Sequence, residues 1–306
     1  MRLKRRQFLL LASLSAASFI GLETTRKILT ASESSHLKIT QYKGDDMASI
    51  PNGKPLFRFV AIGDTGTGEK GQYEVAKAMV RYYQNYPFQV VTLLGDNIYN
   101  NGEIEKINAV FEKPYQPLLE KGVKFYACLG NHDIRTENGN RQVTYPLFNM
   151  QGRYYTFEYN PVQFFVLDGN NNADWEKQIP WLEDQLKRSQ TPWKIVYSHF
   201  PIYSSGLYGV NPELINRLTP LFKKYGVQLY MNGHEHNYER TKSIEGTTYL
   251  ISGNGGASIR PIEPSELTEN AASTLGFTAI EIYADQIFIQ AIDTNNQVFD
   301  QAIIRL

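Results

Sequence analysis

Five times in this chain of 306 residues, an apolar run typical of a buried strand ends in a short polar loop. The five runs and their loops are FRFVAI before GDTG (63–66), FQVVTLL before GDNIY (95–99), VKFYACL before GNHD (130–133), WKIVY before SHF (198–200) and 227–231 before GHEH (233–236). In open α/β folds, loops at the carboxyl ends of strands line the ligand site. We therefore expect these five loops to converge at the carboxyl edge of a sheet.

Helical patterns separate the first three of these strands. Apolar side chains recur at helical spacing over 71–85, and 103–121 is also helical but interrupted by Pro114 and Pro117. The order strand, helix, strand, helix, strand with short loops predicts parallel strands joined by right-handed crossovers.

The second half of the chain mixes helices with strands that follow one another directly. We expect strands at 154–159 and 162–167, helices at 174–189 and 212–225, and consecutive tail strands at 247–252, 277–283, 286–292 and 297–305. Turn signals between the tail strands favour antiparallel pairing. The prediction is an α/β fold in which helices surround a pair of mixed sheets.

Metal-binding residue types are concentrated in the polar loops. They hold four of the five histidines, and the full set is Asp64, Asp96, Tyr99, Asn131, His132, His199, His234 and His236. Each loop alone is more often an ordinary turn, but five in order indicate a common site. Oxygen donors mixed with imidazoles suit iron, zinc or manganese and argue against metals bound by soft thiolates. The single Cys128 lies inside an apolar strand and fits a small core residue.

The first residues have the features of an export signal. MRLKRR precedes an apolar run of 15 residues at 8–22, which is shorter than the roughly 20 residues of a membrane span. The pair Arg5-Arg6 resembles the twin-arginine signal, so we expect an export signal at 1–31 and a periplasmic or secreted protein. An ordinary secretory signal and a retained anchor are the alternatives. A polar linker at 32–55 and one catalytic domain at 56–306 would follow.

Charge excludes a polybasic nucleic-acid binder. The 31 basic and 31 acidic side chains cancel, and without 1–31 the remainder carries 25 basic and 30 acidic groups, about −5. An anionic substrate would then be attracted by a local positive site such as a metal. We expect no nucleic-acid partner, and membrane contact only through a retained N-terminal segment.

The ordered blocks GDTG, GDNIY, GNHD, SHFPIY (198–203) and GHEHNYER (233–240) resemble those of the metallophosphoesterases. Tyr99, three residues after Asp96, resembles the mark of the purple acid phosphatases, here in their small single-domain form. The resemblance covers about 57–256. It implies a four-layer α/β/β/α sandwich of two mixed sheets flanked by helices, and hydrolysis of phosphate monoesters by a metal-bound hydroxide.

The resemblance also implies a role for each residue. Ferric iron would be held by Asp64, Tyr99 and His236, a divalent iron, zinc or manganese by Asn131, His199 and His234, and Asp96 would bridge the two. Asn131 and His132 would bind the substrate phosphate. His132 would also protonate the leaving alkoxide, with Asp133 orienting its ring.

One departure from the family pattern concerns the loop after His199. Many relatives have further histidines there, whereas 200–217 contain none and supply Tyr203, Ser204, Ser205 and Tyr208. Proton donation to the leaving group therefore rests more heavily on His132. Two other functions stay open: a phosphodiesterase or nucleotide hydrolase on the same fold, and an exported metal- or phosphate-binding protein without hydrolytic activity.

Overall fold

The computed structural model describes residues 41–42 and 48–306. The expected export signal at 1–31 lies outside these residues, as does part of the expected linker. Of that linker, Gln41–Tyr42 form strand β1, which pairs with a strand of the main body. Within the described ranges, no helix combines the length and apolar character needed to span a bilayer.

The first sheet has six strands in the order β14-β13-β12-β2-β3-β4. Their bounds are β2 (Phe57–Ile62), β3 (Val90–Leu93), β4 (Lys124–Ala127), β12 (Gly276–Ile282), β13 (Gln286–Asp293) and β14 (Val298–Arg305). Strands β2, β3 and β4 are parallel, as the alternating pattern predicted. Strands β12, β13 and β14 add in antiparallel fashion to the β2 edge, which confirms the expectation for that part of the tail.

The second sheet has eight strands in the order β1-β11-β9-β10-β8-β7-β6-β5. Their bounds are β5 (Tyr155–Tyr159), β6 (Val162–Val166), β7 (Trp193–Tyr197), β8 (Leu229–Asn232), β9 (Tyr238–Thr241), β10 (Thr248–Ser252) and β11 (Thr268–Ala272), beside β1. The expected antiparallel series of tail strands is wrong for β10, which lies parallel to β8 in this sheet. Strands β9 and β11 were not expected, because YERT and TENAA are short and polar and lack a strand-like apolar pattern.

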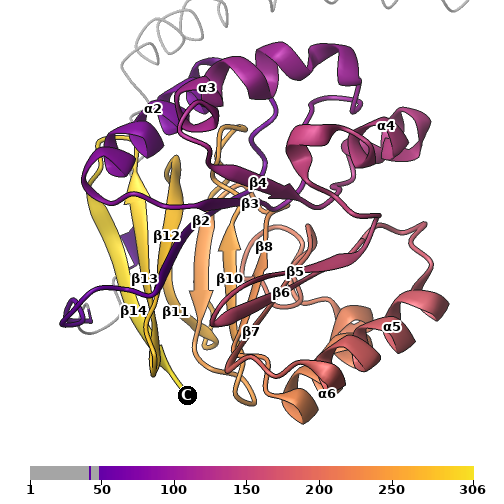
Figure 1. Cartoon of the computed structure of the whole chain (residues 1–306), viewed down its shortest axis with the longest axis vertical. Coiled ribbons are helices and arrows are strands. Elements are labelled where there is room, and N and C mark those ends of the chain that lie inside the picture. Colours follow the sequence, from indigo (N-terminus) through magenta and orange to yellow (C-terminus); the bar gives the residue numbers. More distant parts are fainter. Residues whose placement is uncertain (1–40, 43–47) are drawn as a thin grey trace, which may run out of the picture. The chain divides into compact units, whose positions relative to one another are not determined.

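Helices cover the outer face of each sheet (Figure 1). They are α2 (Lys70–Asn85) and α3 (Lys113–Leu119) on the six-stranded sheet, and α5 (Trp175–Arg188) and α6 (Pro212–Tyr225) on the eight-stranded sheet, with a short α4 (Asn140–Val143) between them in sequence. Single helical turns occur at η1 (Ile104–Lys106), η3 (Asp133–Arg135), η4 (Glu137–Gly139) and η5 (Pro146–Phe148).

Local sequence signals explain how these helices begin and end. The side chain of Asn211 accepts a hydrogen bond from the Leu214 amide at the start of α6, and Gly226 ends that helix at φ 66°. The interruption expected at Pro114 and Pro117 is wrong, because both prolines lie within α3, which follows directly on a π-helical stretch, η2 (Asn108–Glu112). Pro114 is the second residue of α3, and the first turn is where a helix tolerates proline best.

Alternation along β2 shows how the layers are built. Phe57, Phe59 and Ala61 face the second sheet, whereas Val60 and Ile62 face α2. Between the sheets, the Phe164 ring lies 5.0 Å from Phe59, edge to face. The buried side chains thus form three layers: helix on sheet, sheet on sheet, and sheet on helix. This confirms the expected four-layer α/β/β/α arrangement.

Candidate metal centre

The five polar loops come from both sheets, not from the single sheet edge that the sequence suggested. Three loops follow β2, β3 and β4 of the first sheet, and two follow β7 and β8 of the second. Hydrogen bonds join the two edges: the Gly63 amide donates to the Ser252 carbonyl at 2.7 Å, and His199 Nδ1 donates to the Leu94 carbonyl at 2.8 Å. The sandwich therefore brings all five loops together at one place.

The backbone bends sharply at several of these residues. Asp64, Asp96 and His234 have φ values of 58°, 54° and 69°, in the left-handed region that side chains other than glycine rarely adopt. Such conformations cost on the order of 1–3 kcal/mol each and cluster at functional sites. Gly95 allows a close approach, because a Cβ there would lie 2.6 Å from His199 Nδ1. These three residues therefore keep an unfavourable backbone conformation that directs their side chains into the site.

Asp64, Tyr99 and His236 form one group. The Tyr99 hydroxyl donates to Asp64 Oδ1 at 3.0 Å and lies 3.2 Å from His236 Nε2, which is 3.4 Å from the same Asp64 oxygen. His236 Nδ1 donates to the Ser258 carbonyl at 3.0 Å, so its Nε2 is the ring nitrogen that faces the group. These are the three residues expected to hold the first metal.

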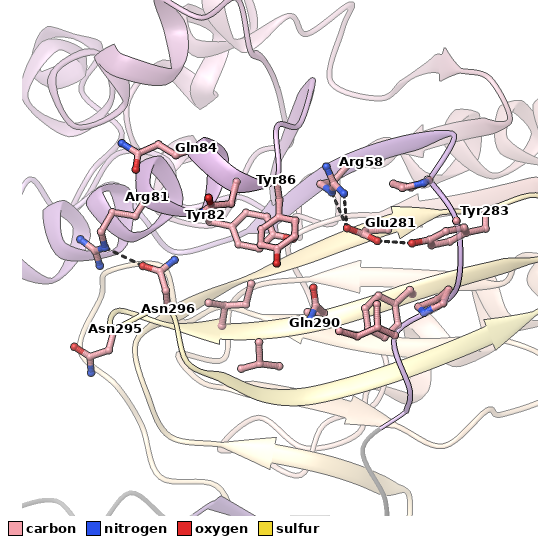
Figure 2. A pocket seen from close by; sticks show the side chains of 18 residues that line it. Arg58, Arg81, Tyr82, Gln84, Tyr86, Glu281, Tyr283, Gln290, Asn295 and Asn296 are labelled. Carbon is pink, nitrogen blue, oxygen red and sulfur yellow. Dashed lines mark hydrogen bonds and ion pairs between the residues drawn. The ribbon is translucent and has the colours of Figure 1, made fainter.

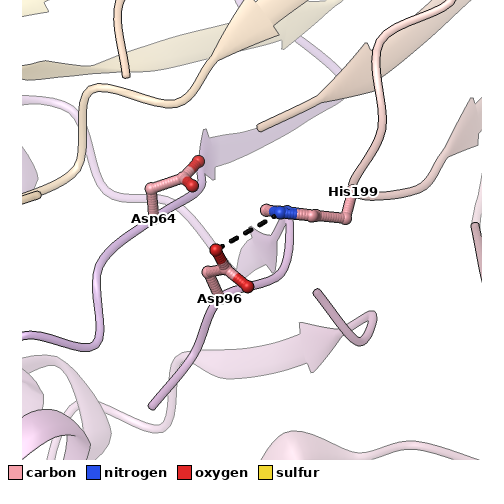
Figure 3. A group of neighbouring side chains, drawn as sticks. All are labelled: Asp64, Asp96 and His199. Carbon is pink, nitrogen blue, oxygen red and sulfur yellow. Dashed lines mark ion pairs between the residues drawn. The ribbon is translucent and has the colours of Figure 1, made fainter. Parts of the chain in front are cut away.

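Asn131, His199 and His234 form a second group. His199 Nε2 lies 3.1 Å from Asn131 Oδ1, 3.1 Å from His234 Nδ1 and 3.4 Å from Asp96 Oδ2. Asp64, Asp96 and His199 are all buried and offer ligand atoms within 4.8 Å of one another (Figure 3). Asp96 thus lies where the two groups meet, as its expected bridging role requires.

The donor chemistry of this cluster fits cations. The hydrogen bond from Nδ1 of His199 turns Nε2 toward the oxygens of Asn131 and Asp96, so that this nitrogen can coordinate a cation once it has lost its proton. Burial opposes a charge on His199, but the carboxylates of Asp96 and Asp64 raise its pKa to about 9. The position therefore attracts positive charge strongly. Oxygens and imidazole nitrogens facing one another in a buried site suit iron, zinc or manganese.

Neutral forms prevail at two other members of the set. Burial and the neighbouring His199 lower the pKa of His234 to about 2, so its imidazole is neutral and able to coordinate. Burial and the carboxylates of Asp64 and Asp96 raise the pKa of Tyr99 above its usual range. A phenolate at Tyr99 therefore requires a strong adjacent cation, as a trivalent metal would supply.

His132 lies at the edge of the cluster and is partly exposed. Its amide donates to Asp96 Oδ1 at 2.8 Å, and its ring Nδ1 donates to the Asn100 carbonyl at 2.7 Å. Nε2 lies 3.9 Å from Asp96 Oδ2 and 3.5 Å from a guanidinium nitrogen of Arg135. With 21% of its side chain exposed, the ring can reach a ligand that enters from solvent.

Asp133 has a different position from the one expected. Its carboxylate contacts backbone amides, not the His132 ring: it accepts from Asn97 and Ile98, both at 3.0 Å, and from Gly130 at 2.8 Å. Burial, together with the charge of Asp96, raises its pKa to about 7. Asp133 therefore ties the GDNIY loop to the GNHD loop and positions both. The expectation that it orients His132 directly is wrong.

The sequence reasoning missed Arg260 and gave Tyr208 no role. The Tyr208 ring stacks on the His234 ring, with centroids 4.1 Å apart and planes at 25°. Arg260 donates to the His234 carbonyl at 3.0 Å, and its guanidinium carbon lies 5.3 Å from the Tyr208 ring centroid. Only the absence of histidine from 200–217 drew attention to this loop, and no sequence signal marked Arg260.

A separate hollow of about 650 Å³ lies between the end of α2 and strands β12–β14 (Figure 2). Its charged groups have partners within the lining: Arg58 pairs with Glu281 at 2.6 Å, the Tyr283 hydroxyl donates to Glu281 at 2.7 Å, and Arg81 donates to Asn296 at 2.9 Å. Its lining includes no member of the expected metal set. This hollow is therefore distinct from the metal centre, and its charged side chains already have polar partners.

Comparison with known proteins agrees with this geometry. Residues 57–238 match the calcineurin-like phosphoesterase family. Mouse tartrate-resistant acid phosphatase type 5 is 27% identical over 239 residues, covering 66% of this chain and 73% of the relative. Purple acid phosphatase 7 of Arabidopsis thaliana is 29% identical over 246 residues, covering 68% of this chain and 74% of the relative.

Two solved structures share the fold. The yellow lupin purple acid phosphatase PPD1 aligns with a TM-score of 0.71 and 21% identity, over 84% of this chain and 55% of its own. Plasmodium GAP50, described as the anchor in the inner membrane complex, aligns with a TM-score of 0.71 and 23% identity, over 82% of this chain and 89% of its own. A fold shared by a phosphatase and an anchor does not decide the function, so the residues of the site must.

Proposed function

Because the chain belongs to the calcineurin-like phosphoesterase family, we propose that it hydrolyses phosphate monoesters at a dinuclear metal centre. The observation that carries the proposal is the meeting of two donor groups at Asp96: Asp64, Tyr99 and His236 on one side, and Asn131, His199 and His234 on the other. Relatives named acid phosphatases support the same reaction.

We assign the two groups to different metals. Asp64, Tyr99 and His236 offer a carboxylate and a phenol to a ferric ion, whereas Asn131, His199 and His234 offer neutral donors to divalent iron, zinc or manganese. Asp96 would be shared between them. Such a pair, when bound, neutralises phosphate charge and lowers the pKa of a coordinated water, which makes it a nucleophile at ordinary pH.

The protein's own groups bind and orient the ester. Asn131 and His132 are proposed to contact the phosphate, and His132 Nε2 to give a proton to the leaving alkoxide. The hydrogen bond from His132 Nδ1 to Asn100 holds the ring with Nε2 toward the cluster. Asp133 does not contact the ester in this proposal; its hydrogen bonds fix the two loops that carry Asp96, Tyr99 and Asn131.

Turnover of matched substrates tests this function. Metal-replete protein should hydrolyse phenyl phosphate between mildly acidic and neutral pH, and diphenyl phosphate much more slowly. Faster turnover of the diester would favour a phosphodiesterase. If the protein hydrolysed neither ester while binding two metals, a non-hydrolytic binding role would replace the proposal.

The N-terminal segment is proposed to direct export by the twin-arginine route. Arg5-Arg6 before the apolar run 8–22 supports this, with the catalytic domain at 56–306. Replacing both arginines by lysine should retain the protein in the cytoplasm while preserving the basic charge. Continued export of that variant would indicate an ordinary secretory signal instead.

A further inference from the structure

Tyr208 covers one face of His234 at the metal centre. The two rings are nearly parallel, with centroids 4.1 Å apart, and Tyr208 remains 51% exposed. One part of the tyrosine is therefore packed against an expected ligand, while another part faces solvent. An aromatic surface in this position adjoins the place where a phosphate ester would bind.

Contacts with Glu235 and Arg260 hold Tyr208 in place. Its amide donates to Glu235 Oε1 at 2.6 Å, and Glu235 is fully buried. The Arg260 guanidinium lies over the tyrosine ring at 5.3 Å and 3.7 Å from Glu235 Oε2. Gly206 permits the loop to pass this close, because a Cβ there would lie 2.6 Å from the Glu235 carboxyl carbon.

The loop that carries Tyr208 is closed at its base. The Asn211 amide donates to the Ile202 carbonyl at 2.9 Å, and the Ser205 amide donates to Glu239 at 2.8 Å. Between these anchors Leu207 and Val210 are also exposed. The loop is thus anchored, and it holds the Tyr208 ring on the His234 side of the site, whereas Arg135 lies on the His132 side.

We propose that Tyr208 is a specificity-determining residue that contacts the organic group of the ester and favours aryl over small alkyl phosphates. Arg260 and Glu235 are positioning residues that hold its ring against His234. This inference rests on the proposed function, because that function supplies the substrate; the position of the Tyr208 ring is independent of it. Aromatic pairs contribute enough beyond simple burial for a selectivity of about 3- to 10-fold.

Two substrates isolate this selectivity. For phenyl phosphate and glycerol phosphate, the ratio of kcat/KM values should fall about 3- to 10-fold in Tyr208→Ala, mainly through a higher KM for the aryl ester. Comparing variants by this ratio cancels the intrinsic reactivity of each ester. Tyr208→Phe should retain the ratio, and Leu207→Ser is the matched control on the same exposed loop.

The positioning role has its own variants. Arg260→Met removes the cation over the ring and should lower the aryl preference in the same direction as Tyr208→Ala, whereas Arg260→Lys should lower it less. Metal content should stay at the wild-type level in all of them. Equal losses for both esters, or a lost metal ion, would overturn the specificity role.

A binding measurement separates this inference from the proposed function. By calorimetry with metal-replete protein, phenylphosphonate should bind more tightly than methylphosphonate, and Tyr208→Ala should remove most of the difference. This measurement needs no turnover. If the protein hydrolysed neither ester, the proposed function would be contradicted, but the binding data would still test the role of Tyr208. Equal binding of the two phosphonates by the wild-type protein would overturn the inference.

Discussion

His234 Nδ1 lies 3.1 Å from His199 Nε2, and the latter nitrogen is turned to the cluster because His199 donates its other N–H to the Leu94 carbonyl. Asn131 Oδ1 and Asp96 Oδ2 approach the same nitrogen at 3.1 and 3.4 Å. Electron-rich atoms crowd together in this way where a cation is to be held between them. The relationship makes the second metal position directly testable.

Replacing His199 should empty that position. In His199→Ala, metal analysis by mass spectrometry should fall from about two ions per chain to about one. The ferric group of Asp64, Tyr99 and His236 should retain most of its metal. His36→Ala, which changes the only histidine outside the polar loops, is the control. A full complement of metal in His199→Ala would contradict the assignment.

Tyr99→Phe tests the first metal through colour. A phenolate bound to ferric iron gives a visible charge-transfer band, so the oxidised wild-type protein should be purple or pink. The variant keeps the ring contact with His132, whose centroid lies 4.4 Å away, but loses the oxygen. The band should vanish while iron remains measurable. Colour that survives in Tyr99→Phe would exclude this residue as the chromophore.

His132→Ala tests proton donation to the leaving group. Loss of a general acid should lower kcat by about 10²–10⁴-fold for alkyl phosphates and less for activated aryl esters, which need the proton less. Metal content should be unchanged, since the His132 side chain is not among the expected metal ligands and its contact with Asp96 Oδ1 is made by the backbone amide, which the substitution retains. Equal losses on both substrate types would assign His132 to binding alone.

Asp133→Ala should destabilise the protein and loosen the site. The substitution leaves buried amides of Asn97, Ile98 and Gly130 without their acceptor, at a cost of about 3 kcal/mol or more in the free energy of unfolding. Denaturant unfolding measures this cost, and metal affinity should fall with it. Asp285→Ala, at an exposed aspartate, is the control. A variant as stable as wild type would show that Asp133 does not tie the loops.

The packing between the sheets is tested at Phe164. Its ring is fully buried and lies 4.6 Å from Phe157 and 5.0 Å from Phe59, so Phe164→Ala should cost about 3–5 kcal/mol. The exposed Leu306→Ala should cost little. Because the five polar loops follow strands of both sheets, metal affinity in Phe164→Ala should also fall. Unchanged metal affinity would mean that contacts among the polar loops keep the site in place without the packing between the sheets.

Much of the fold was predictable because its signals are local. The run FRFVAI, the helical spacing of 71–85 and the Pro and Gly residues around α6 each act within a few residues of themselves. The misplacement of β10 and the omission of β9 and β11 have the opposite origin. The pairing of all three strands depends on partners elsewhere in the sheet, and the residues of β9 and β11 also carry weak strand signals.

The same division applies to the site. Sequence by itself determined the residue types and their order: Asp64, Asp96 and Tyr99, then Asn131, then three histidines, each at a strand end. Only the tertiary structure decided which of them meet, because contacts such as His234 amide to Asp64 Oδ2 join residues 170 positions apart. It also decided that Asp133 supports two loops and that Tyr208 and Arg260 lie beside His234. The physical reason is that strand ends follow from local periodicity, whereas the facing of two sheet edges follows from how the whole core packs.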